Sequence, residues 1–111
     1  MHSVTSGAVY SALNTVETYT SITGLTLYKI GCLVFGKYFY NINSSSPFTL
    51  GGILPTAWRP RIDCQVALIN SSDDIVVGQL VIYKSNGEIK LWNGGGNFNG
   101  RNYTANITYV V

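Results

Sequence analysis

Short apolar and aromatic runs, each ended by turn-forming residues, fill the chain after Gly24 and constrain its fold more than any other feature. Runs of this kind, broken by Gly, Pro, Asn and Ser, are typical of the strands of a sandwich or a barrel. The expected strands are Leu25–Ile30, Leu33–Asn43, Phe48–Ile53, Arg61–Asn70, Ile75–Ser85, Glu88–Trp92 and Tyr103–Val111. We therefore expect a mainly β fold, an antiparallel β-sandwich of the jelly-roll type.

Alternation of apolar and polar residues predicts which side of a strand faces the core. In the last expected strand, one face carries Tyr103, Ala105, Ile107, Tyr109 and Val111. The stretch "KSNGEIKLW" predicts a hairpin whose turn, Asn86–Gly87, has positive φ at both residues. Leu33–Tyr40 and Ile75–Tyr83 are apolar on both faces, which favours one face against the core and the other against a neighbouring subunit.

The first part of the chain has a different pattern, typical of a helix from residue 4 to about residue 20. Val9, Leu13 and Val16 lie on one stripe of that helix, and Thr5 is a good N-cap. A helix of this length is marginal on its own in water, so its apolar stripe needs partners. We expect residues 1–23 to form a neck helix that trimerises through Val9, Leu13 and Val16, and residues 24–111 to form the head domain.

Charge and composition exclude several classes of partner. Charged residues make up 11% of the chain, less than half the usual share of about 25%, which favours a subunit that covers part of its surface with copies of itself. The seven Lys and Arg residues give a net charge of only +2 and are scattered, so nucleic acid is not an expected partner. No apolar stretch has the length of a membrane span, and the N-terminus does not resemble a signal peptide.

The side chains that enzymes and metal sites use are largely missing. His2 is the only histidine, which argues against nucleophilic triads and multi-histidine metal sites. Asp73 and Asp74 are adjacent in a Ser/Asp loop and are interpreted as a solvated turn. Cys32 and Cys64 are interpreted as reduced core thiols, and a disulfide between them stays open. We expect no enzyme activity, no cofactor and no metal.

One stretch has the residue types of a sugar-binding surface. Trp92 alternates with Ile89 and Leu91, which we place in the core, so we expect its ring to face outward. The loop that follows supplies amides and a guanidinium for hydrogen bonds, beside a flat ring for stacking. The candidate ligand-binding residues are Trp92, Asn97, Phe98, Asn99 and Arg101. Trp58, between two prolines, is interpreted as structural.

Two stretches resemble a known family. "SVTSGAVYSALN" resembles a phrase in tail-fibre and receptor-binding proteins of bacteriophages and prophages, especially those of gut Gram-positive bacteria, where it forms a short trimeric neck helix. "GGILPTAWRP" and "IYKSNGEIKLW" resemble parts of the β-sandwich head domains at the tips of such proteins. The resemblance implies a homotrimeric fibre tip on the virion, made in the bacterial cytoplasm, that binds a polysaccharide of the host cell surface. It implies no site residue, because the receptor-binding loops differ between members.

Two other functions compete with this one. The chain could be a structural trimerisation knob, with receptor binding elsewhere on the fibre. It could also be a trimeric module similar to C1q or tumour necrosis factor that binds a protein ligand. An apolar groove between subunits favours a protein ligand, whereas a polar cleft lined by aromatic residues favours sugar.

Overall fold

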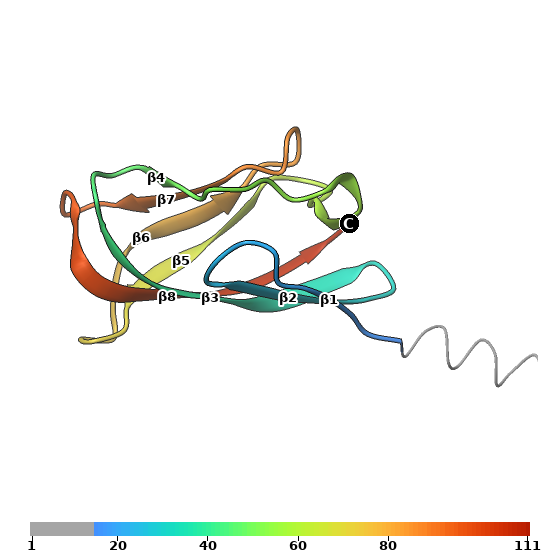
Figure 1. The fold of residues 1–111 in the computed structure, drawn as a ribbon, viewed down its shortest axis with the longest axis horizontal. Coiled ribbons are helices and arrows are strands. Elements are labelled where there is room, and N and C mark those ends of the chain that lie inside the picture. The colour runs from blue at the N-terminus through green and yellow to red at the C-terminus, as the bar shows by residue number, and fades with distance from the viewer. Residues whose placement is uncertain (1–14) are drawn as a thin grey trace, which may run out of the picture.

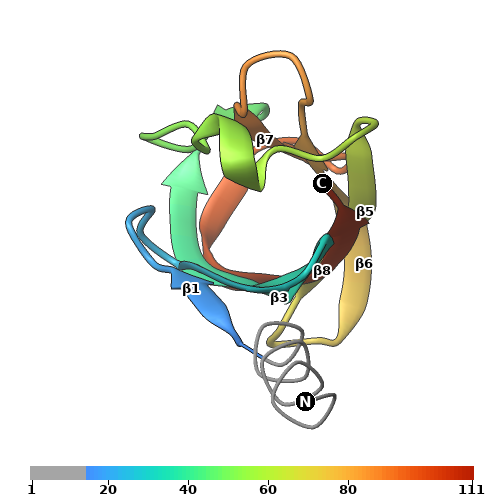
Figure 2. The ribbon, with the colours of Figure 1, turned by 90° about the vertical axis from the view of Figure 1, so that its right-hand side faces the viewer.

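A computed structural model describes residues 15–111, and these residues form one antiparallel sheet of eight strands in the order β1-β2-β3-β8-β5-β6-β7-β4. The sheet bends round on itself into a half-barrel (Figures 1 and 2). The expected mainly β, antiparallel fold is confirmed, with one curled sheet in place of two packed sheets. The strands are β1 (Glu17–Tyr19), β2 (Leu25–Ile30), β3 (Leu33–Ser44), β4 (Phe48–Thr49), β5 (Cys64–Asn70), β6 (Ile75–Ile82), β7 (Ile89–Asn93) and β8 (Phe98–Val110), and a short 3-10 helix covers Thr56–Trp58.

The two longest strands, β3 and β8, form the spine of the sheet. They pair from Leu33↔Val110 to Ser44↔Phe98, with one irregularity between Ile42 and Asn43. Gly100 lies in this irregular part of β8 at a φ of 72°, a conformation that favours glycine and is typical of a bulge. A bulge bends a strand and increases its twist, which lets the long strands curl around the core.

The concave side of the sheet holds the core. The alternation predicted for the last strand is confirmed, since Tyr103, Ala105, Ile107 and Tyr109 are all buried and Val111 is partly buried against the core. The other long strands also point side chains into this core. Fully buried core residues are Leu27, Val34, Tyr38, Leu54, Leu68, Leu80, Ile82, Ile89 and Leu91.

The start of the described chain differs from the expected helix. Glu17–Tyr19 is a strand that pairs with β2, with Thr18 opposite Tyr28, and Ile22 is in the core. The β-branched and aromatic side chains at these positions suit a strand that packs on a neighbour. The helix therefore does not extend to residue 20, and the sheet begins before the expected boundary at Gly24. Val9 and Leu13 lie outside the described residues, and Val16 is exposed.

Trp58 is structural, as expected, and stands at the centre of a small cluster. Its ring lies 5.5 Å from the Tyr19 ring and 4.4 Å from the Lys29 ammonium. That ammonium donates a hydrogen bond of 2.8 Å to the Ala57 carbonyl and lies 3.5 Å from the Glu17 carboxylate. Because the buried Lys29 is both paired and hydrogen-bonded, its charge is tolerated at the end of the core.

The hairpin between β6 and β7 lies where the sequence predicts it, but its turn differs. Gly87 has a φ of 73°, and Asn86 is not among the residues with positive φ. The Gly87 N–H donates to the Tyr83 carbonyl, and the Tyr83 N–H donates to the Glu88 carbonyl. The turn is therefore wider than the expected two-residue turn, and only its glycine adopts the left-handed conformation.

Both cysteines are free thiols. Cys64 is buried, and burial raises the pKa of its thiol. Cys32 is exposed at the β2–β3 turn. The interpretation as a core thiol is therefore right for Cys64 and wrong for Cys32. Among residues 15–111, no helix is long and apolar enough to cross a membrane.

Stability is expected to fall at alkaline pH because two core tyrosines are held neutral. Burial raises the pKa of both Tyr38 and Tyr109, and the Tyr109 hydroxyl donates to the Trp58 carbonyl. In the unfolded chain each phenol has a pKa of about 10. Their contribution is therefore fully present below about pH 10 and is lost as the pH rises toward the folded-state pKa, by up to about 1.4 kcal/mol per pH unit for each tyrosine.

Chemical denaturation between about pH 9 and pH 11 measures this dependence. The variant Tyr109→Phe is expected to show a shallower slope of unfolding free energy against pH. A free energy that stays flat across this range would contradict the prediction.

Candidate functional site

The end of the sheet farthest from residue 15 carries most of the asparagines. Three connections meet there: residues 45–47 after β3, residues 71–74 after β5 and residues 94–97 after β7 (Figure 1). The ends of the long strands β3 and β8 frame the same region. We call it the asparagine tip, and it comprises Asn41, Asn43, Asn93, Asn97, Asn99, Arg101 and Asn102.

Ser46 joins two of these connections. Its hydroxyl accepts a hydrogen bond of 2.9 Å from the Asn93 N–H, and its own N–H donates to the Asn97 side-chain oxygen at 3.4 Å. The side-chain amide of Asn93 donates to the Asn97 backbone carbonyl at 3.3 Å, and its oxygen accepts from the Gly95 N–H at 2.9 Å. Two connections distant in sequence are thereby held as one unit.

A second set of hydrogen bonds holds the strand ends. The Asn41 amide donates to the Gly100 carbonyl at 2.8 Å and to the Asn102 side-chain oxygen at 3.3 Å. The Asn102 carbonyl accepts from both the N–H and the hydroxyl of Ser71, at 2.9 and 3.0 Å. The bulge in β8 is therefore fixed on both sides.

Three side chains of the tip take no part in these hydrogen bonds. Asn43, Asn99 and Arg101 are exposed, and none of them makes a side-chain hydrogen bond or ion pair with a residue in the range 15–111. Asn43 is the register partner of Asn99, and Arg101 is the partner of Ile42. Because side chains of directly opposed residues lie about 5 Å apart at their Cβ atoms, the two amides are neighbours. Arg101 is opposite the buried Ile42, so its guanidinium lies at the same end of the sheet but starts from the other face.

This arrangement suits recognition of a polar, hydroxyl-rich ligand. Each amide offers both donors and an acceptor, and the guanidinium offers several donors in a fixed plane. The frame around them is already hydrogen-bonded, so binding would order few groups. The exposed carboxylates of Asp73 and Asp74 lie in the neighbouring loop 71–74, so the end of the molecule carries both signs of charge.

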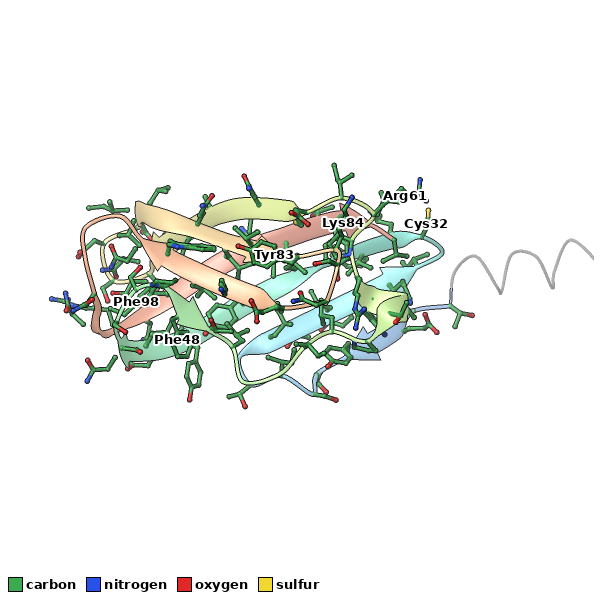
Figure 3. The ribbon with its side chains drawn as sticks, turned by 90° about the horizontal axis from the view of Figure 1, so that it is seen from above. Cys32, Phe48, Arg61, Tyr83, Lys84 and Phe98 are labelled. Atoms are coloured by element: carbon green, nitrogen blue, oxygen red, sulfur yellow. The ribbon has the colours of Figure 1, made fainter. Side chains whose placement is uncertain are left out.

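Phe98 is not part of this exposed set, contrary to the sequence prediction. It is buried, and its ring lies 4.9 Å from the Tyr103 ring and 6.4 Å from the Phe48 ring (Figure 3). The reason is that β8 begins at Phe98 and not at Tyr103. A residue expected in a glycine-rich loop is instead the first core residue of a strand.

Trp92 faces outward, as expected, from the wall of the sheet that β7 forms. Ile89 and Leu91 are buried, whereas Trp92 is half-buried and pairs with Gln79 of β6. In the order of the sheet, β5 and β6 separate β7 from β8. The predicted set is thus divided: Asn97, Asn99 and Arg101 belong to the tip, and Trp92 belongs to the outer wall.

The sequence pattern alone did not reveal that β3 contributes to this site. Asn41, Asn43 and Ser46 come from the stretch "NINSSS", more than fifty residues before "NFNGRN". Both stretches contain Asn-x-Asn at the end of a strand, and that shared pattern was the available signal. Only the pairing of β3 with β8 brings the two together.

Comparison with known protein families and curated proteins finds no relative of this chain: no protein-family model matches it, and the search of curated proteins finds no match. Among residues 15–111, no group of three or more His, Cys, Asp and Glu side chains is placed to hold a metal ion.

Proposed function

We propose that this chain is the receptor-binding tip of a bacteriophage or prophage tail fibre, a homotrimer that attaches to a polysaccharide of the bacterial cell surface. The observation that carries the proposal is the free set Asn43, Asn99 and Arg101 on a hydrogen-bonded frame. This set lies at the end of the sheet opposite the start of the described chain (Figure 1). A fibre that continues on the N-terminal side would present this end outward.

A trimer is supported by one uncovered apolar face. On the outer side of β2, β3 and β8, Tyr28 lies opposite Phe35, and Leu33 lies opposite Val110. The Tyr28 and Phe35 rings are 5.7 Å apart, and Leu33 is 42% and Val110 40% exposed. Contiguous apolar surface of this kind is typical of an interface. We call it the outer apolar face, comprising Tyr28, Leu33, Phe35, Phe39 and Val110.

The protein is expected to be a trimer in solution, and Leu33→Asp is expected to dissociate it. Burying one leucine contributes about 1.5–3 kcal/mol, and the substitution would place a charge in every copy of the interface. Light scattering on the full chain at micromolar concentration measures the mass. The matched control is Ile53→Asp, which changes an exposed branched residue in the connection after β4, outside the outer apolar face and outside the two strands that are apolar on both faces. A monomer mass for the unsubstituted chain would contradict the proposal.

Binding itself is tested with the full chain on a panel of cell-wall polysaccharides and whole cells from Gram-positive gut bacteria. Attachment to at least one of them, competed by the soluble polysaccharide, is expected. Attachment that is lost after protease treatment of the cells would instead indicate a protein ligand. A trimer that attaches to none of the panel would favour the structural knob.

A further inference from the structure

A partly polar pocket lies on the concave side of the sheet, at the seam between the edge strands β1 and β4 where the curled sheet stays open. It is bounded by the β1–β2 loop, the inner face of β3 and the segment from β4 to Gly52. Its volume is about 250 Å³, below the roughly 300–1,000 Å³ of pockets for drug-sized ligands. The pocket therefore has room for one small ring. We call it the seam pocket.

Aromatic rings and hydroxyl groups line the seam pocket. Tyr40 and Phe48 supply rings, with Tyr40 41% exposed and Phe48 half-buried, and Ser21 and Thr23 supply exposed hydroxyls. Figure 3 shows Phe48 near the end of the molecule that carries the asparagine tip. No charged side chain lines the pocket, so it offers nothing to neutralise a phosphate, a carboxylate or an ammonium group.

Tyr38 provides an independent sign that the pocket is built for a ligand. Its side chain lines the pocket and is fully buried, yet its hydroxyl has no hydrogen-bond partner among the described residues. Buried polar groups are nearly always paired, and an unpaired hydroxyl lowers stability. Burial, with the Tyr40 phenol as a second cause, raises the pKa of Tyr38, so this hydroxyl stays protonated and can donate.

We propose that the seam pocket binds one neutral sugar ring, with Tyr40 and Phe48 contacting its face and the Tyr38 hydroxyl bonding to one of its hydroxyls. Sugars present an apolar face and several hydroxyls, and aromatic residues with a few polar groups match both. This inference rests on the proposed glycan-binding function and assigns it a second subsite, besides the asparagine tip.

Amide NMR spectra of the full chain during titration with methyl α-D-glucopyranoside, methyl β-D-galactopyranoside and N-acetylglucosamine test the site. At least one of these neutral sugars is expected to shift the amides of Ser21, Thr23 and Gly51, with a dissociation constant on the order of millimolar. D-glucuronic acid is the charged comparison and is expected to shift them less. Unshifted pocket amides with all three neutral sugars at tens of millimolar would overturn the inference.

Tyr38→Phe separates a ligand contact from a merely buried hydroxyl. We expect about tenfold weaker sugar affinity with a melting temperature that is unchanged or higher, because the variant removes an unpaired buried group. Tyr40→Ala is also expected to weaken affinity. Tyr83→Phe, which removes a phenol that does not line the pocket, is the matched control and should bind normally. A higher melting temperature with unchanged affinity for Tyr38→Phe would overturn the assigned contact.

Attachment to whole cells separates this inference from the proposed function. If the unsubstituted chain attaches to cells while sugars leave the pocket amides unshifted, the seam pocket is overturned and the proposed function stands. If sugars shift the pocket amides but the chain attaches to no cell, the pocket is supported and the fibre-tip function is overturned.

Discussion

Arg101→Ala is expected to weaken attachment to cells by at least about tenfold without lowering the melting temperature. Arg101 is exposed and makes no hydrogen bond or ion pair within residues 15–111, so its removal should change the unfolding free energy by less than about 0.5 kcal/mol. A lost hydrogen bond to a charged group costs about 1.5–3 kcal/mol in binding. In a trimer the loss occurs at three sites and is amplified by avidity.

The measurement combines a melting curve with cell or polysaccharide binding on the same sample. Lys84→Ala is the matched control, because it removes one positive charge from an exposed side chain at the opposite end of the molecule (Figure 3). Asn99→Ala is expected to behave like Arg101→Ala. Unchanged binding by both tip variants would contradict the assignment of the tip.

Trp92→Ala distinguishes the outer wall from the tip. The ring is half-buried on β7, so we expect a lower melting temperature if it packs against its neighbours in the trimer. We expect weaker binding at an unchanged melting temperature if it contacts the receptor. Binding and melting that are both unchanged would restrict the receptor contacts to the tip.

Gly78→Ala is expected to destabilise the protein by about 3 kcal/mol or more, the largest stability change that we predict. A Cβ atom at residue 78 would lie 1.7 Å from the Trp92 carbonyl oxygen of the neighbouring strand. Real atoms do not approach so closely, and the obstacle is backbone, which cannot rotate away. The strands β6 and β7 would have to separate at this point.

Gly51→Ala is the matched control, since a Cβ atom there meets no atom within 4 Å and the residue has no positive φ. It should leave stability unchanged or raise it slightly, by up to about 1 kcal/mol, through the unfolded state. Denaturant unfolding of the two variants and the unsubstituted chain measures the difference. Equal midpoints for Gly78→Ala and Gly51→Ala would show that the strands tolerate the added methyl group.

The sequence predicts well wherever a single strand carries its own alternating pattern. Tyr103, Ala105, Ile107 and Tyr109 are buried as expected, because side chains of a strand point to opposite faces in turn. The outward position of Trp92 follows from the same rule. Phe98 lies outside the expected strand, because the glycine-rich stretch hides the true start of β8. The bulge at Gly100 also inserts one residue, so a strict two-residue period does not give the core face before it.

The sequence by itself therefore determined the β class, most strand positions and the core face of β8, since these depend on local propensity and a two-residue period. Only the tertiary structure decided that Glu17–Tyr19 is a strand, because that choice depends on a free edge of β2. It also decided the single curled sheet and the asparagine tip. Asn43 and Asn99 are fifty-six residues apart, and they become neighbours only through the register of β3 and β8, which no local pattern encodes.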